Sequence, residues 1–192
     1  MLNIFHKFTY ILGSASPRRA QLLQDMGLSF DVIPSDIDEV YDESIPPEEV
    51  PLFLSRLKAD SLGDRISPHH LLITADSVVI SDGQILGKPS NKEHATNMLQ
   101  NLSNREHQVI TGVSLYDGYK LDSFSVETKV FFNELLPEEI EYYILRFQPF
   151  DKAGSYGIQE WIGHCKIKKI VGSYTNVMGL PTAELYEAIH KF

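Results

Sequence analysis

Two arginines stand at the start of an expected helix, where the backbone charge disfavours them. In "ILGSASPRRAQLLQDMG" an apolar strand ends in small residues, and Ser16 and Pro17 then read as the N-cap and first turn of a helix. Arg18 and Arg19 follow at once, at the positive end of the helix macrodipole, where each cation costs up to about 1 kcal/mol. Because small residues and free helix N–H groups suit an anion, the spacing favours an anion-binding site. The alternative is two arginines that point into solvent or pair with nearby acids.

An aspartate interrupts an apolar run further along the chain. Asp76 lies within "LLITADSVVI", where a carboxylate is costly unless it is paired, hydrogen-bonded or bound to a metal. Such surroundings raise the proton affinity of an acid or hold a cation, and both suit a general base. An aspartate at a strand end that faces water is the less favoured alternative.

Three further acids cluster in the loop "SDIDEVYDESIPPEE", namely Asp36, Asp38 and Glu39. Carboxylate oxygens suit magnesium or manganese, and a polyphosphate substrate would share such a metal. A solvated acidic loop explains the same residues at least equally well.

Single residues elsewhere suit phosphate or base contacts. Lys58 and Lys88 are uninformative one by one, but Lys88 lies between Gly87 and Pro89 in a rigid turn after a strand. In "AGSYGIQEW" the side chain of Gln159 could read the edge of a base. The alternative for this glycine-flanked segment is a tight structural turn.

Several standard sites are excluded. "GQILGKPS" has three residues between its glycines where a P-loop needs four, and no His-Glu-x-x-His motif occurs. His69-His70 reads as a solvated loop, with metal binding the minor alternative. The single cysteine, Cys165, excludes an intramolecular disulfide and a cysteine-based metal site.

The composition is that of an ordinary globular protein. The chain has 192 residues, of which 43% are hydrophobic and 22% charged, and its formal net charge is -9. This charge argues against nonspecific binding to nucleic acid or to an anionic membrane, although a small anion responds only to local charge. No segment approaches the roughly 20 apolar residues of a membrane helix. We read the amino terminus as a buried strand rather than a signal peptide and expect a cytoplasmic protein.

Strand and helix patterns alternate, which predicts one compact α/β unit with a mixed sheet. The expected elements are a strand at about residues 9–14, a helix ending near Gly27, a short strand in "SFDVIP", a helix over 48–62, a central buried strand "HLLITADSVVI", a hairpin through Gly83 to "QILGKP", a helix opened by a Ser90–Glu93 capping box, two long strands joined at Asp117-Gly118, a helix in "LPEEIEYYILRF", and a final strand, glycine-rich turn and closing helix.

Read together, these residues resemble the Maf family of nucleoside triphosphate pyrophosphatases. "SASPRR", "TADSVV", "GKP", "TGV", "DKAGSYGIQ" and "VMGLP" occur in the family's order and spacing between residues 14 and 181. The form "AGSYGIQ" resembles the branch that acts on dTTP and UTP. The resemblance implies a single domain over 1–192, with a mixed bent sheet flanked by helices, two lobes and a central cleft, as in inosine triphosphatases.

The resemblance also implies an activity: hydrolysis of a nucleoside triphosphate to the monophosphate and pyrophosphate, with a divalent cation, magnesium or manganese. Asp76 would be the proton acceptor that activates water for attack on the α-phosphorus, and Glu39 would bind the metal with it. The triphosphate would be held by Ser14, Arg19, Lys58 and Lys88. The positions tied to substrate choice are Arg18, Ser77 and Gln159.

Two departures from the family pattern concern the base. Ser77 stands where this branch more often has threonine, and Glu160 stands where glycine is frequent, near the expected base pocket. The sequence therefore specifies the reaction type more closely than the base of the substrate. A pyrophosphatase for another modified nucleotide is an alternative. Another is a non-catalytic nucleotide-binding regulator of cell division and septum formation. A homodimer is common in the family, but no feature of this sequence demands one.

Overall fold

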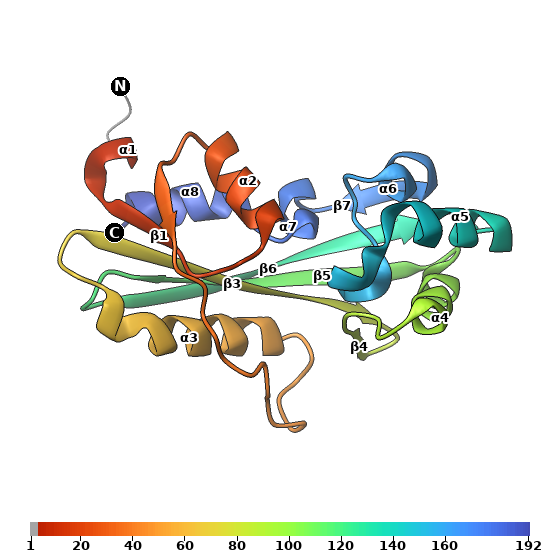
Figure 1. Cartoon of the computed structure of the whole chain (residues 1–192), viewed down its shortest axis with the longest axis horizontal. Helices are drawn as coiled ribbons and strands as arrows, with labels where there is room; N and C mark the ends of the chain where they lie inside the picture. Colours follow the sequence, from red (N-terminus) through yellow and green to blue (C-terminus); the bar gives the residue numbers. More distant parts are fainter. Residues whose placement is uncertain (1–3) are drawn as a thin grey trace. The chain divides into compact units, whose positions relative to one another are not determined.

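The computed structural model describes residues 4–192 and contains a seven-stranded sheet of order β2-β1-β3-β5-β6-β7, with β4 paired to β3 (Figure 1). The strands are β1 (Thr9–Leu12), β2 (Phe30–Val32), β3 (His70–Ser81), β4 (Gln84–Leu86), β5 (Glu106–Tyr116), β6 (Leu121–Phe132) and β7 (Ile167–Val171). The α-helices are α1 (Ile4–Lys7), α2 (Pro17–Asp25), α3 (Val50–Leu62), α4 (Lys92–Leu102), α5 (Pro137–Phe147), α6 (Trp161–Lys166), α7 (Tyr174–Met178) and α8 (Thr182–His190). The short 3-10 helices are η1 (Gly63–Arg65), η2 (Pro149–Asp151) and η3 (Ala153–Ser155).

The sheet is mixed, as the sequence predicts. Strand β1 pairs in parallel with both β2 and β3, whereas β4 runs antiparallel to β3 and β7 antiparallel to β6. The apolar run around Asp76 forms β3, whose side chains are almost all buried. The prediction of a mixed sheet flanked by helices, with β3 as a central buried strand, is confirmed.

The chain divides into two compact units. Unit 1 comprises the described residues up to Asp76, then Thr111–Val126 and Gly179–Phe192, and unit 2 comprises Ser77–Ile110 and Glu127–Met178. The divisions fall inside β3, β5 and β6. The two units agree with the two lobes expected from the sequence.

Unit 1 positions helix α3 very closely against strand β5. A Cβ atom on Gly112, the glycine of "TGV", would lie 2.4 Å from backbone atoms of Pro51 and Leu52 in the first turn of α3. Ser55 reinforces this contact, since its hydroxyl donates to the Leu52 carbonyl at 2.8 Å and shares a 2.9 Å hydrogen bond with the Ser114 hydroxyl of β5. Figure 1 shows α3 and α8 on opposite faces of this part of the sheet.

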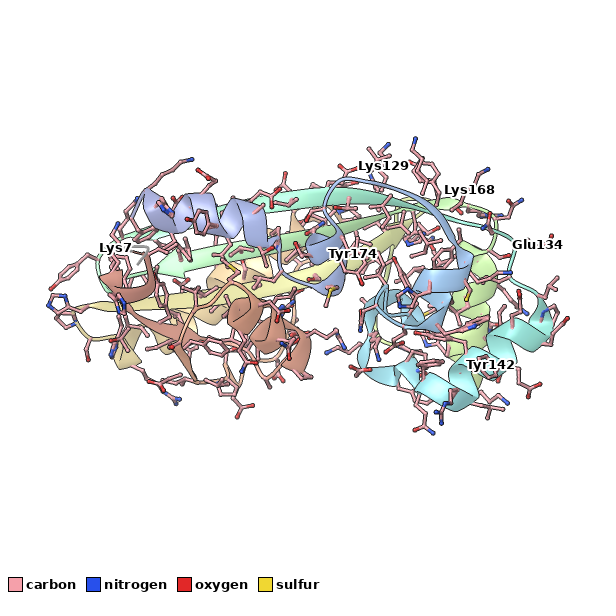
Figure 2. The ribbon with its side chains drawn as sticks, turned by 90° about the horizontal axis from the view of Figure 1, so that it is seen from above. Lys7, Lys129, Glu134, Tyr142, Lys168 and Tyr174 are labelled. Carbon is pink, nitrogen blue, oxygen red and sulfur yellow. The ribbon has the colours of Figure 1, made fainter. Side chains whose placement is uncertain are left out.

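Unit 2 encloses a second core between β6, α4 and α5. Its buried members include Leu99, Val130 and Tyr143. Strand β7 ends the sheet and carries two lysines, Lys168, which is labelled in Figure 2, and Lys169. Lysines at such an edge deter pairing with the strands of other chains. Over residues 4–192 no helix is both long and apolar enough to span a bilayer.

Three local expectations need correction. A short helix, α1, occupies part of the amino-terminal segment that we read as a strand, and two helices, α7 and α8, follow the last strand where one was expected. The capping box at Ser90 is wrong, because Asn91 is the N-cap of α4 and its side chain accepts from the backbone N–H of His94 at 2.8 Å. Both residue types cap helices, and Asn91, whose backbone is extended, is the one that caps α4.

Replacing Gly112 by alanine is expected to lower the free energy of unfolding by at least about 2 kcal/mol, because the new methyl group meets backbone rather than a flexible side chain. Urea denaturation measures the change. Gly87→Ala is the matched control, since a Cβ there has no atom within 4 Å. Equal effects of the two substitutions would contradict the close packing of α3 on β5.

Candidate functional site

Helix α2 begins as the sequence predicts. Ser16 is its N-cap, Pro17 lies in the first turn, and the Ser16 hydroxyl accepts from the Arg19 backbone N–H at 3.4 Å. No acidic side chain lies in the first turn. No acid in the first turn of α2 therefore offsets the partial positive charge at this end of the helix.

The Arg19 side chain is held inside unit 1 rather than extended into solvent. Its Nε donates to the Gly179 carbonyl at 2.8 Å, and its Nη1 donates to the Ser14 hydroxyl at 3.2 Å. The same hydroxyl accepts from the Ser16 backbone N–H at 3.2 Å. The structure thus brings Ser14 and Arg19 together, as expected, and adds Gly179 of the "VMGLP" motif.

A lysine joins the two carboxylates that the family resemblance assigns to catalysis and metal binding. Lys58 Nζ lies 2.5 Å from Asp76 Oδ1 and 2.6 Å from Glu39 Oε1. Lys58 and Asp76 are 6% and 8% exposed, whereas the Glu39 side chain is 47% exposed. Asp76 is therefore a buried and paired carboxylate within β3, and the alternative of a water-facing strand end is wrong.

The charges of this group act on one another. Burial lowers the pKa of the Arg19 guanidinium, Asp76 and Glu39 raise it, and the neighbouring Arg18 lowers it. Arginine stays protonated under such shifts, so Arg18 and Arg19 remain cations beside the group formed by Lys58, Asp76 and Glu39. Although the whole chain is acidic, this part of unit 1 suits an anion.

The donor set fits a divalent metal that arrives with a phosphate. Glu39 Oε1 and Asp76 Oδ1 both contact Lys58 Nζ, so these two oxygens can be no farther apart than the sum of their distances to Nζ. Magnesium is commonly bound by one or two carboxylates, with substrate phosphates and water as its other ligands. Within residues 4–192 no three His, Cys, Asp or Glu side chains form a metal-binding group, and Asp36 and Asp38 are exposed.

Unit 2 carries the other predicted residues. Ser77 is half-buried on β3, Lys88 is exposed after β4, and Gln159 is half-buried after η3. The Gly154 backbone N–H donates to the Gly87 carbonyl at 3.1 Å, which joins the turn before Lys88 to the segment before Gln159. The structure therefore brings these two segments together.

The segment 152–160, which we call the recognition loop, is tightly fixed. Gly154 and Ser155 have φ angles of 66° and 62°, in the left-handed region that disfavours a residue such as serine. The Tyr156 hydroxyl bonds His107 Nε2 at 2.8 Å, and the Gly157 N–H donates to the Tyr143 hydroxyl at 2.9 Å. Burial lowers the pKa of His107 to about 4, so this histidine is neutral at physiological pH.

Gln159 presents an unused acceptor. Its Oε1 is buried and has no hydrogen-bond partner within the described chain. Buried polar atoms without a partner are few in native proteins. The acceptor of this side chain is therefore unsatisfied within residues 4–192.

Glu160, whose effect the sequence left open, is fully engaged. It accepts from the Tyr143 hydroxyl and forms a 3.1 Å ion pair with Lys152. Lys152 is buried and also pairs with Asp151 at 2.8 Å. Sequence reasoning missed Tyr143, Lys152 and Gly179, and its one signal was that the last two belong to the motifs "DKAGSYGIQ" and "VMGLP".

Comparison with known sequences shows which family these motifs belong to. The sequence profile of a family described as Maf-like protein matches residues 9–192. The chain belongs to the Maf family.

Relatives of this Maf protein match it along its whole length. A Porphyromonas gingivalis protein named dTTP/UTP pyrophosphatase is 47% identical over 196 residues, which cover 100% of this chain and 98% of the relative. A Parabacteroides distasonis protein of the same name is 46% identical and covers 100% of both chains. Among solved structures, the Staphylococcus aureus Ham1 protein is similar over 65% of this chain and 71% of that chain, with a TM-score of 0.41 and 16% identity.

Replacing Lys58 by methionine is expected to strengthen the binding of free Mn²⁺ by about tenfold or more, because two neighbouring carboxylates lose their cation. Mn²⁺ binding without nucleotide is followed by electron paramagnetic resonance. Adding Glu39→Gln to this variant should abolish the gain.

Lys92→Met is the control for charge alone, because it removes the same charge from an exposed pair with Glu141. Its Mn²⁺ affinity should equal that of the wild type. Unchanged or weaker Mn²⁺ binding in Lys58→Met would contradict a metal site at Glu39 and Asp76.

Proposed function

We propose that this Maf protein hydrolyses dTTP, UTP or modified pyrimidine relatives to the monophosphate and pyrophosphate. The observation that carries the proposal is the buried Asp76 carboxylate on Lys58, in the unit that also holds Arg19 at the start of α2. The names of the full-length relatives in Porphyromonas and Parabacteroides support the pyrimidine substrates.

In this proposal Asp76 is the proton acceptor. Its carboxylate is buried and held in place by Lys58, so it can orient a water molecule and take its proton as the water attacks the α-phosphorus. Transfer at a phosphate needs positioning and charge neutralisation more than covalent help. A magnesium or manganese ion bound by Glu39 and Asp76 would supply further neutralisation of the phosphate charge.

The remaining predicted residues bind and select the nucleotide. Ser14, Arg19, Lys58 and Lys88 would hold the triphosphate, with the positive end of the α2 macrodipole adding to the attraction. Arg18, Ser77 and Gln159 would act in substrate choice. A cytoplasmic location, the absence of nucleic-acid partners and the oligomeric state stay predictions from the sequence.

Pyrophosphate release from a panel of nucleoside triphosphates, with and without Mg²⁺ or Mn²⁺, tests the activity. We expect dTTP and UTP to be the best substrates and release to require the metal. Tight nucleotide binding without pyrophosphate release would contradict the proposal and favour a non-catalytic regulator.

Asp76→Asn is expected to lower kcat at least about a thousandfold, because the amide accepts no proton at neutral pH, while nucleotide binding largely persists. Single-turnover assays and equilibrium binding separate the two effects. Near-normal turnover in the folded variant would overturn the role of Asp76.

The two arginines should differ in their effects. Arg19→Met is expected to lower kcat/KM for all triphosphates alike, by about tenfold or more. The reason is that this side chain would contact the phosphates that every substrate shares. Arg18→Met should instead change the ranking of substrates. Comparing kcat/KM across the panel checks the division, and equal effects of both substitutions would contradict it.

A further inference from the structure

The recognition loop holds two neighbouring side chains against one glycine. A Cβ atom on Gly157 would lie 2.9 Å from Gln159 Nε2, 2.9 Å from Glu160 Cδ and 3.1 Å from Glu160 Oε2. The amide nitrogen of Gln159 and the carboxylate of Glu160 thus lie on the same side of the loop. The Gln159 oxygen is one of the buried side-chain atoms that have no hydrogen-bond partner within residues 4–192.

The Glu160 carboxylate is itself fixed in place. The Tyr143 hydroxyl donates to Oε2, and Lys152 Nζ pairs with Oε1 at 3.1 Å. Tyr143 comes from α5 and also accepts from the Gly157 N–H at 2.9 Å, so one hydroxyl ties both the glycine and the carboxylate to that helix. The Glu160 side chain is only 17% exposed, which limits the screening of its charge by water.

The charge of this carboxylate bears on the orientation of the neighbouring Gln159 amide. An ionised carboxylate only accepts hydrogen bonds, whereas a glutamine amide has a donating NH₂ and an accepting oxygen. Negative charge attracts the NH₂ end and repels the oxygen. In the structure it is the nitrogen of Gln159 that lies on the Glu160 side of Gly157, and the oxygen is left as an acceptor without a partner among the described residues.

We propose that Glu160 is a specificity-determining positioning residue, which orients the Gln159 amide so that its oxygen selects bases with an N–H donor at ring position 3. Uracil and thymine carry this donor, whereas the same position of cytosine is an acceptor. An acceptor facing an acceptor leaves both without a hydrogen bond, which is the kind of mismatch that rejects a ligand most strongly. The inference rests on the proposed function and deepens it.

Glu160→Gln tests the inference, because it keeps the size of the side chain and removes its charge. The variant amide can accept from or donate to Gln159, so either orientation of Gln159 becomes available. We expect the preference for UTP over CTP in kcat/KM to fall about tenfold or more. The change should lie in KM rather than kcat, since Asp76 is untouched.

Equilibrium binding of UTP and CTP without divalent metal gives the same comparison independently of turnover. The ratio of the two Kd values should fall in parallel with the ratio of kcat/KM. Tyr143→Phe removes the hydroxyl that holds Glu160 and should shift both ratios in the same direction by a smaller factor. This second variant keeps the test decisive should Glu160→Gln fold poorly.

Glu141→Gln is the matched control, because it makes the same change in an exposed carboxylate of unit 2 that pairs with Lys92. Its ratios should equal those of the wild type. An unchanged UTP-to-CTP ratio in both test variants, or an equal loss for both nucleotides, would overturn the inference. The wild-type rates on the substrate panel separately decide the proposed function.

Discussion

The buried ion pair between Lys58 and Asp76 determines how closely α3 must pack against the sheet in unit 1. A lone carboxylate in the middle of β3 would cost several kcal/mol, so α3 must bring a cation within contact distance. Gly112 allows the first turn of α3 to lie directly on β5, and the Thr74 hydroxyl donates to the Ser55 carbonyl at 2.7 Å, which ties α3 to β3. The "TGV" motif therefore acts through the space left by a missing side chain. Its effect on the candidate site is to place Lys58.

Stability alone gives a weak reason for such a pair, because apolar residues of similar volume often stabilise a core equally well. Lys58 also pairs with a second carboxylate, the half-exposed Glu39. This group lies in the unit where Arg19 contacts Ser14. Interactions of exposed charges fade over roughly 8 Å at physiological salt, so the distant acids of this chain do not cancel the local positive charge. A chain with a net charge of -9 can therefore still bind a triphosphate.

Local patterns in the sequence predicted the parts of the structure that local physics determines. The apolar run gave the buried Asp76, and Ser16-Pro17 gave the start of α2. The partners were beyond such reasoning, since Lys58 lies 18 residues before Asp76 and Gly179 lies 160 residues after Arg19. A single lysine or backbone carbonyl carries no periodic signal. The pairing of Glu160 with Tyr143 of α5 was hidden for the same reason, although the position was recognised as unusual.

The recognition loop combines a strained backbone with neighbours that are fixed by hydrogen bonds. Ser155 adopts a left-handed backbone that costs a non-glycine residue about 1 kcal/mol or more. The loop keeps this conformation because hydrogen bonds to His107 and Tyr143 fix the next two residues, Tyr156 and Gly157. Under the proposed function, a loop fixed in this way would not rearrange to suit each base, so discrimination would depend on which atoms it presents. The orientation of the Gln159 amide would then matter more than the number of contacts that a base could make.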